Sequence, residues 1–267
     1  MKKITLILLS AFTFLQVSAQ KKPTVQQVSL RAPANIKTDG KATEWGNECK
    51  AYNPATELFY TIANDDKKLY LIFQATDRYN ITRIVNGGLK ISIQKNGGKT
   101  DIGSPTVQFP YMEKGKRASF NKRLDLTGET GERRKYLLDS AMQANNRKLR
   151  DNVKYIYTKG IPGVDSLISI YNDHGIQAAN TFDIDKVYTA EIAIDLKHFE
   201  LSIADTSKFA YHITLNGGVN KYAMGMSFGS VMNDDGTPAE AFAKQLNHQV
   251  EVNGATTDFW GEYTLAK

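Results

Sequence analysis

The sequence has few cysteines, no long apolar run and no known catalytic motif, which are the features that most directly identify the class of a protein. Cys49 is its only cysteine, which excludes an intramolecular disulfide, so stability must come from packing. We interpret it as a buried, unreactive thiol; a dimer through this thiol is the alternative. The chain also lacks an apolar run long enough for a transmembrane helix. No stretch rich in Pro, Gly and Ser divides it, and we therefore expect one domain and no transmembrane segment.

Signatures of common catalytic sites are missing as well. The four histidines share no metal-ligand spacing, and no His-Glu-x-x-His or Gly-x-Ser-x-Gly pattern occurs. One of them, His212, alternates out of phase with its apolar neighbours, which predicts a surface position. We therefore expect no enzyme activity. A glycosidase pair of carboxylates remains an alternative, because such pairs meet in space and not in sequence.

The N-terminus has the pattern of a secretory signal peptide. Lys2 and Lys3 precede an apolar stretch of about twelve residues, and Val17-Ser18-Ala19 is a small-residue cleavage site. The apolar stretch is too short to span a bilayer. We expect residues 1–19 to be removed and residues 20–267 to work as an exported, soluble protein in the periplasm or outside the cell.

Positive charge is concentrated in one segment. The formal net charge of +6 becomes +4 without Lys2 and Lys3, whereas residues 113–154 alone hold twelve Lys and Arg against six Asp and Glu. Such a run is typical of a solvated helix face or a mobile loop. The alternative is a patch for an anionic partner of the cell envelope, such as an acidic polysaccharide or a membrane surface. Nucleic acid is not expected as a partner, because the chain has an export signal and no nucleic-acid-binding motif.

Alternation of apolar and polar residues dominates the rest of the chain and predicts strands with one buried face. The alternating segments are residues 89–93, 188–195, 209–215, 222–228 and 259–265. Two further runs, 57–63 and 69–75, flank a polar turn and predict a hairpin. Residues 69–73 are apolar on both faces, which predicts a strand in the middle of a sheet.

Many short strands separated by Gly, Asn and Asp turns predict an all-β fold, an antiparallel β-sandwich of the jelly-roll or immunoglobulin-like kind. A helix is expected only from residue 132 to about 150, where apolar side chains recur at spacings of three and four. We interpret residues 113–152 as a partly helical, basic insertion into a single β-sandwich domain. The strand pattern resumes at 153–157 and 167–171.

Four segments resemble, in order and spacing, the family 9 carbohydrate-binding modules and their DOMON-like relatives. They are Ile36-Lys37-Thr38-Asp39-Gly40 with Glu44-Trp45, residues 64–71, residues 188–196 and residues 259–263. The resemblance implies a non-catalytic β-sandwich that binds a carbohydrate or similar ligand, with Trp45 packed at one end. Residues 83–91 lack the acidic pair that the family carries in the corresponding strand, so the chain looks like a divergent secreted branch.

Four residues are candidates for ligand binding. Tyr79 and Tyr111 fall in predicted loops, where burial explains an aromatic side chain less readily, so we expect them to stack on sugar rings. Asn86 lies in the segment that replaces the family's ligand-binding strand. Trp260 alternates out of phase with Phe259 and faces the opposite side. It belongs either to a second layer of the core, which we favour, or to an open stacking platform.

Four aspartates are candidate metal ligands. Asp39, Asp65, Asp66 and Asp77 offer oxygen atoms of the kind that Ca²⁺ prefers. Turn formation explains Asp39, Asp65 and Asp66 equally well, because an Asp side chain bonds the backbone of its own turn. Both explanations stay open, and calcium is the only cofactor that we consider.

Overall fold

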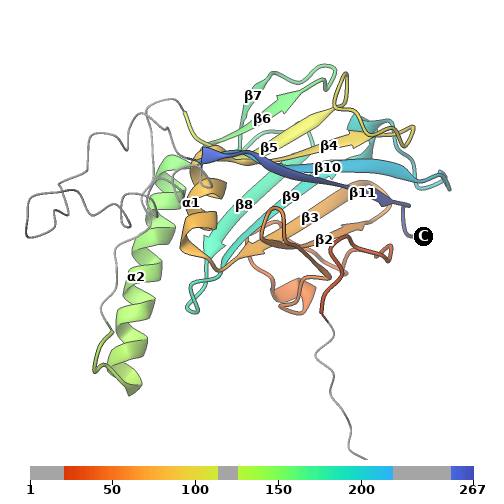
Figure 1. The fold of residues 1–267 in the computed structure, drawn as a ribbon. Helices are drawn as coiled ribbons and strands as arrows, with labels where there is room; N and C mark the ends of the chain where they lie inside the picture. Colours follow the sequence, from red (N-terminus) through yellow and green to blue (C-terminus); the bar gives the residue numbers. More distant parts are fainter. Residues whose placement is uncertain (1–20, 114–125, 219–253) are drawn as a thin grey trace, which may run out of the picture.

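The computed structural model describes residues 21–113, 126–218 and 254–267. The predicted signal peptide and the predicted strand at 222–228 lie outside the described residues. Within these ranges the chain forms two antiparallel sheets, of five and six strands, packed face to face (Figure 1). The all-β sandwich expected from the alternating pattern is therefore confirmed.

The five-stranded sheet has the order β1-β2-β3-β9-β8. Its strands are β1 (Ala51–Asn53), β2 (Leu58–Asn64), β3 (Lys68–Ala75), β9 (Tyr188–Asp195) and β8 (Ile176–Phe182). The predicted hairpin is confirmed, since β2 pairs with β3 in antiparallel register. In the turn between them, Asp65 Oδ1 accepts hydrogen bonds of 2.7 Å from the amides of Lys67 and Lys68. β3 lies in the middle of the sheet, as its run of apolar residues predicted.

The six-stranded sheet has the order β11-β10-β4-β5-β6-β7. Its strands are β11 (Thr257–Tyr263), β10 (Phe209–Leu215), β4 (Leu89–Gln94), β5 (Thr106–Tyr111), β6 (Tyr155–Lys159) and β7 (Leu167–Ser169). Ile213 pairs with Ile91 on one side and with Phe259 on the other, and all three side chains are buried. Side chains of this inner set alternate with those of the outer face, as the period of two requires.

Both sheets contribute to one core. Tyr60 of β2 and Tyr211 of β10 meet across it, with ring centroids 6.5 Å apart in an edge arrangement and hydroxyl oxygens 3.1 Å apart. Cys49 is buried just before β1, and burial raises the pKa of its thiol to about 12. The thiol therefore stays protonated, in agreement with the unreactive cysteine that we predicted.

Helix α1 (Arg78–Gly87) was not predicted. Asp77 caps it, because its Oδ1 accepts a hydrogen bond from the Tyr79 amide at 2.9 Å, and Ile84 lies on a face that packs into the core. Gly88, at a φ of 79°, follows its last turn. The loop position expected for Tyr79 is thus wrong. Residues 83–87 are helical and not part of a strand, because a cap and apolar residues at helical spacing act there together.

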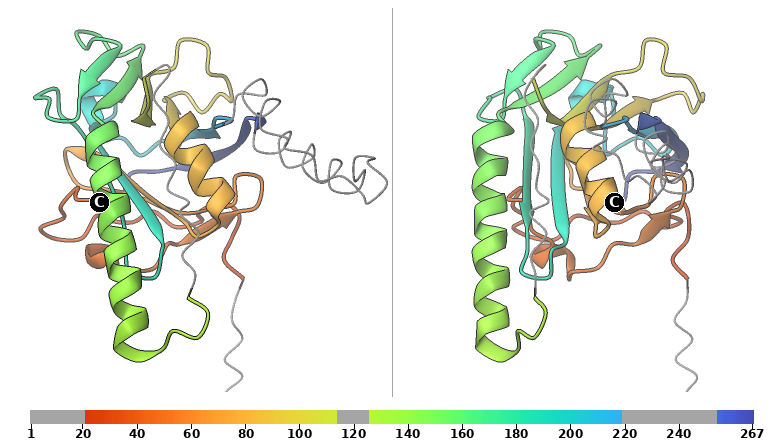
Figure 2. Two further views of the ribbon diagram at one scale, coloured as in Figure 1. Left: turned by 90° about the vertical axis from the view of Figure 1, so that its left-hand side faces the viewer. Right: turned by 60° about the vertical axis from the view of Figure 1, so that its left-hand side comes forward.

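Helix α2 (Gly131–Asn152) confirms the predicted helix and stands beside β8 (Figure 2). Met142 and Leu149 are buried on the side facing the sandwich. Asn146 donates from Nδ2 to the Phe182 carbonyl at 2.9 Å and accepts from the Phe182 amide at 2.7 Å. One side chain thereby satisfies backbone groups at the edge of the sheet. Neither this helix nor any other in the described ranges is long and apolar enough to cross a membrane.

Two segments far apart in the sequence meet at Asn64, the last residue of β2. Its backbone amide donates to the Leu30 carbonyl at 3.0 Å, and its carbonyl accepts from the Ala32 amide at 2.8 Å. Its side chain pairs with the backbone of Ala266 through two hydrogen bonds of 2.8 and 3.0 Å. A single buried asparagine therefore fixes the segments near residues 30 and 266.

Candidate functional site

Residues 36–45, the first of the four segments described above, contact a buried carboxylate, that of Glu191. Glu191 of β9 accepts at Oε1 from Trp45 Nε1 at 2.7 Å, and at Oε2 from the amides of Asp39 and Gly40 at 2.9 and 2.7 Å. Burial raises the pKa of Glu191 above its usual range, although the three hydrogen bonds act in the opposite direction. Residues 39–45 thus cover the outer side of β9, which explains why that strand is buried on both faces and not on one. Trp45 is half-buried and packs into this cluster, as predicted, but on the outer side of β9 and not at one end of the sandwich.

The four predicted metal ligands do not come together: Asp65 and Asp66 share the turn between β2 and β3, and Asp39 and Asp77 lie elsewhere. Asp39 and Asp65 bond backbone amides in their own turns, Asp66 pairs with Arg31 at 2.8 Å, and Asp77 caps α1. Among the described residues, no group of three or more His, Cys, Asp or Glu side chains is placed to hold a metal ion. Calcium binding by these residues stays a prediction.

The predicted ligand-binding residues fall into two pairs. Tyr79 and Asn86 lie on α1, and Tyr79 is exposed. Tyr111 and Trp260 lie on β5 and β11 of the six-stranded sheet. The loop position expected for Tyr111 is wrong, because it ends β5 and pairs with Tyr155 of β6. The four residues therefore do not form one site.

Trp260 lies on the outer face of the six-stranded sheet, at the edge strand β11. Its ring stacks on the ring of His212 from β10, with centroids 4.2 Å apart and planes at 5°. Trp260 is half-buried and is not part of the core, which this strand reaches through Phe259 and Tyr263. The core position that we favoured for Trp260 is wrong, because the residues pointing inward already fill that space. It is instead an aromatic side chain on an outer surface.

Two carboxylates hold His212 in place. Its Nδ1 lies 2.8 Å from Asp101 Oδ2, on the loop between β4 and β5, and its Nε2 lies 2.7 Å from Asp258 Oδ2 on β11. His212 is only 9% exposed, so the surface position predicted for it is also wrong. Each ring nitrogen thus has a carboxylate oxygen within hydrogen-bond distance, and these two contacts fix the orientation of the imidazole.

A hollow of about 440 Å³ opens beside Trp260. Lys99, Lys208, Glu262 and Gln27 contribute its polar lining. Lys208 Nζ lies 3.5 Å from Glu262 Oε2, so these two side chains already partner each other at the rim. An aromatic ring next to a few hydrogen-bonding groups is the usual composition of a small-ligand site.

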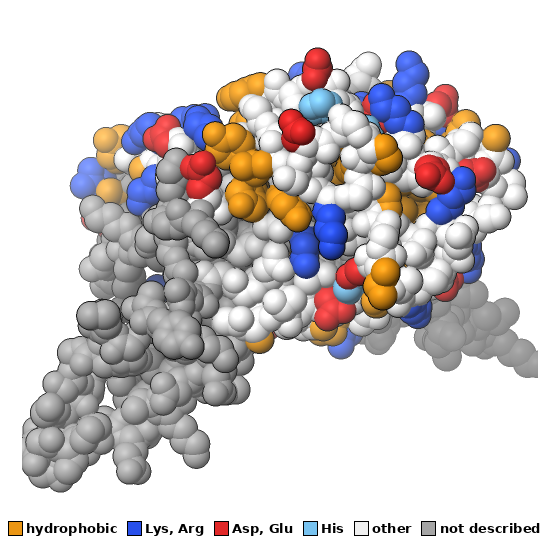
Figure 3. Space-filling view, turned by 90° about the horizontal axis from the view of Figure 1, so that it is seen from above, with side chains coloured by type: hydrophobic (Ala, Val, Ile, Leu, Met, Phe, Trp, Pro, Cys, Tyr) orange, Lys and Arg blue, Asp and Glu red, His pale blue; other side chains and the backbone are white. Residues whose placement is uncertain are grey.

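A second aromatic group occupies the same outer face, on β5 and β6. The rings of Tyr111 and Tyr157 lie with centroids 5.9 Å apart and planes at 18°, and Tyr155 pairs with Tyr111 in register. All three side chains are half-buried, and Figure 3 shows hydrophobic side chains gathered on this face. We did not single out Tyr155 and Tyr157, although their alternation with Ile156 in the predicted strand carried the signal.

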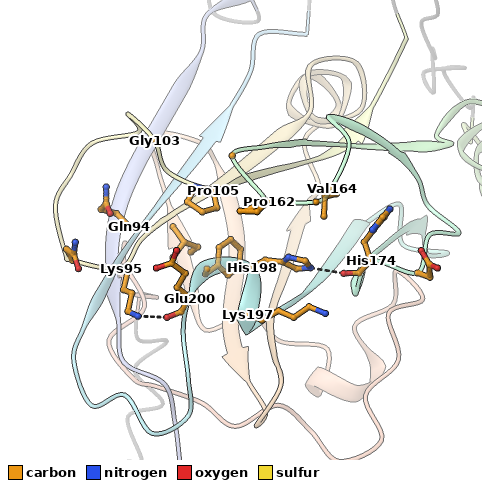
Figure 4. A pocket seen from close by; sticks show the side chains of 16 residues that line it. Gln94, Lys95, Gly103, Pro105, Pro162, Val164, His174, Lys197, His198 and Glu200 are labelled. Carbon is orange, nitrogen blue, oxygen red and sulfur yellow. Dashed lines mark hydrogen bonds between the residues drawn. The ribbon is translucent and has the colours of Figure 1, made fainter.

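A cleft of about 840 Å³ lies at one end of the sandwich (Figure 4). Its walls include His174 and His198, and the Nε2 of His198 lies 2.7 Å from the His174 carbonyl oxygen. Lys95 donates from Nζ to the Glu200 carbonyl at 2.5 Å. No Trp or Tyr lines this cleft, and its one phenylalanine, Phe199, is buried. The aromatic outer face is therefore the stronger candidate for ligand binding.

The structure thus defines a two-sheet β-sandwich that displays aromatic rings on the outer face of one sheet. No family model matches the chain, and no curated protein matches it either. Among solved structures it is similar to a family 9 carbohydrate-binding module from Caldicellulosiruptor kristjanssonii in complex with glucose. The identity is 9% and the TM-score 0.35, over 90% of this chain and 95% of that chain.

A second similar structure is a candidate carbohydrate-binding protein from Bacteroides uniformis, with 8% identity and a TM-score of 0.34. The match covers 74% of this chain and 86% of that chain. The first structure belongs to the family that the four sequence segments resemble. Similarity at this level carries no argument about the ligand, which must rest on the site itself.

Proposed function

We propose that this is an exported, non-catalytic protein that binds carbohydrate on the outer face of its six-stranded sheet, with Trp260 as the main stacking ring. The observation that carries the proposal is the rigid stack of Trp260 on His212, which Asp101 and Asp258 hold from both sides. A ring fixed in advance loses little conformational entropy when a ligand covers it.

The chemistry around the ring suits a sugar. A pyranose presents C–H groups on its faces and hydroxyls around its rim, and the electron-rich face of an indole attracts such C–H groups. Lys99, Glu262 and Gln27 line the adjacent hollow, where donors and acceptors can meet the hydroxyls. The resemblance of four sequence segments to carbohydrate-binding modules supports the same conclusion.

A non-catalytic role is supported by the state of the reactive groups. Cys49 is buried with its pKa raised, and both nitrogens of His212 already face carboxylate oxygens. Asp101 and Asp258, which flank one imidazole, are both engaged by it, and a carboxylate so engaged is a poor general acid or base for a glycosidic bond.

Affinity electrophoresis in gels containing xylan, laminarin, pullulan or hydroxyethyl cellulose tests the proposal. We expect retention of the wild-type protein by at least one polymer, and about tenfold weaker binding by Trp260→Ala, because the change removes a large apolar contact. Tyr79→Ala and Tyr111→Ala probe the other predicted residues. Tyr136→Ala, an exposed tyrosine on α2, is the matched control. Uniform lack of retention, or retention unaffected by Trp260→Ala, would refute the proposal.

Export is tested separately from binding. Expression with the native N-terminus in a diderm bacterium, followed by fractionation and N-terminal sequencing, should give a periplasmic or secreted protein that starts at Gln20. A cytoplasmic protein that retains residues 1–19 would contradict it.

A second candidate function is binding to an anionic partner of the cell envelope. The observation that favours it is a set of exposed basic side chains on α2: Arg133, Arg134, Lys135, Arg147, Lys148 and Arg150. The triple variant Arg147→Glu, Lys148→Glu, Arg150→Glu should lose binding to vesicles containing phosphatidylglycerol or to heparin, and the wild-type interaction should weaken as salt rises. Equal binding by wild type and variant would exclude α2 as the contact.

A further inference from the structure

The outer face of the six-stranded sheet carries aromatic rings at two distant positions with polar side chains between them. The register gives two neighbouring rows across the strands: Trp260, His212, Ser92 and Thr106 in one, and Asp258, Thr214, Lys90, Gln108 and Tyr157 in the other. Trp260 stands at one edge of the sheet, and Tyr157 pairs its ring with that of Tyr111 near the opposite edge.

The two aromatic positions are separated by a distance that a single sugar cannot bridge. Trp260 lies on β11 and Tyr157 on β6, four strand spacings away in the order β11-β10-β4-β5-β6. At roughly 4.8 Å per spacing, the two rings are about 19 Å apart across the sheet. A ligand that touches both must be an oligomer of several sugar units.

The surface between the rings is low and polar. Ser92, Thr106 and Thr214 are short side chains that lie close to the sheet, and the hydroxyls of Ser92 and Thr106 are 2.8 Å apart. The two rows carry charges of both signs, since Asp258 and Lys90 lie in one row and Lys159 pairs with Thr106 at the end of the other, and His212 is held by its two carboxylates. These three short side chains leave the strip low but are themselves buried, so the polar groups that a ligand can reach there are those of Lys90, Gln108 and Asp258.

We infer that the ligand is an extended, uncharged polysaccharide that crosses the strands and contacts Trp260 and the Tyr111–Tyr157 pair at the same time. This inference rests on the proposed function and specifies its ligand. The strip has aromatic ends and a polar middle formed by Lys90, Gln108 and Asp258, whereas the centre of a protein interface is typically apolar. It also lacks the excess of Lys and Arg that an anionic polymer requires.

The inference predicts that affinity depends on chain length. Two weak contacts joined by one chain bind more tightly than either alone, because the second contact forms within the complex. Isothermal titration of the full chain with disaccharides and hexasaccharides of xylose, mannose and glucose measures this. We expect the binding hexasaccharide to exceed its disaccharide by about tenfold or more in affinity.

Variants separate the two contacts. Tyr157→Ala should abolish most of the gain from chain length and leave disaccharide affinity unchanged, whereas Trp260→Ala should weaken both ligands. Tyr157→Phe keeps the ring and should retain the gain, and Tyr136→Ala on α2 controls for the loss of a surface tyrosine. Circular dichroism and the melting temperature of each variant exclude unfolding as the cause.

The outcomes distinguish this inference from the function on which it rests. If hexasaccharide and disaccharide bind equally and Tyr157→Ala has no effect while Trp260→Ala weakens both, the extended ligand is refuted and carbohydrate binding stands. If no oligosaccharide or polymer binds, both fail together. If Tyr157→Ala changes self-association in light scattering but leaves sugar affinity unchanged, the tyrosines form an interface between copies, and the inference is overturned.

Discussion

The two tryptophans of this chain are both held by carboxylates, but in opposite ways. Trp45 donates its indole N–H to Glu191, a buried acid that also accepts two backbone amides. No acid among the described residues accepts the indole N–H of Trp260; its ring lies on His212, and the acids Asp101 and Asp258 bind the imidazole. In the first cluster, Glu191 binds the indole of Trp45 and thereby holds residues 39–45 against β9. In the second, Asp101 and Asp258 hold the imidazole of His212, on which the indole of Trp260 stacks.

This difference separates a structural tryptophan from a ligand-binding candidate. The indole N–H of Trp45 is bonded to a buried acid, so this ring is part of the packing and its loss should lower the stability of the fold. When only one face of the ring is supported, the remaining surface is available to a ligand. Changes at each cluster should therefore affect different measurements.

The largest effect on stability is expected at Glu191. Glu191→Ala leaves the Trp45 indole N–H and the amides of Asp39 and Gly40 without their acceptor, and should lower the free energy of unfolding by about 4 kcal/mol. Urea denaturation measures this. Glu191→Gln keeps an acceptor oxygen and should cost clearly less. Equal losses in the two variants would show that hydrogen bonding is not what the glutamate provides.

Gly40→Ala should follow closely, with a loss of about 3 kcal/mol. Gly40 has a φ of 80°, and a Cβ there would lie 2.7 Å from backbone atoms of Asn180. Gly46→Ala is the matched control, since Gly46 has a φ of 70° but no atom within 4 Å of the added carbon. The difference in melting temperature between the two variants reports the close approach of residues 39–45 to the sheet; no difference would mean that the segment can move away.

His212→Ala should cost less, about 1.5 kcal/mol, because Asp101 and Asp258 are half exposed and regain water. Its main effect should be local: faster amide exchange in the loop between β4 and β5, which Asp101 ties to the sheet, and weaker carbohydrate binding at Trp260. His212→Phe keeps a ring beside the indole but cannot bond Asp101. It should therefore retain most of the carbohydrate affinity while amide exchange in the β4–β5 loop becomes faster. If exchange in the loop is unchanged in both variants, the carboxylate contacts do not hold it.

The smallest effect is a pH dependence at Glu191. Because burial raises its pKa, the folded protein binds this proton more readily than the unfolded chain does. The contribution of Glu191 to stability is therefore fully present below the ordinary pKa of glutamate and is lost as the pH rises through the raised value. The free energy of unfolding of wild type minus that of Glu191→Gln should increase as the pH falls. A constant or opposite trend in urea titrations would contradict the shift.

The sandwich was predictable because its signal is local. Alternation along 89–93 or 209–215 fixes which side chains face inward, and the apolar run at 69–73 places β3 in the sheet interior. Helix α1 was missed because its signals were taken one at a time. Asp77 was treated as a metal ligand and Tyr79 as a loop residue, whereas together with Ile84 they form a cap followed by an apolar helix face.

The candidate site was predictable only in part, because its members come from distant places. Trp260 was named, yet His212 was assigned to the surface and Asp101 was not considered; 111 positions separate these last two residues. The pairing of β10 with β11 brings His212 next to Trp260, and the return of the β4–β5 loop brings Asp101 to His212. Tyr157 could have been found, since its alternation with Ile156 predicts an outward side chain. Its pairing with Tyr111 depends on the register of β5 and β6.

The double attachment at Asn64 has a mechanical consequence. A pull on the last residues acts on the side chain of Asn64, and the backbone of the same residue anchors the segment near Leu30, so load on one flank is transmitted to the other through a single residue. Fraying of the two flanks should therefore be coupled. Force applied through a tag or surface tether after residue 267 would therefore load the hydrogen bonds of Asn64 before it reached the aromatic face.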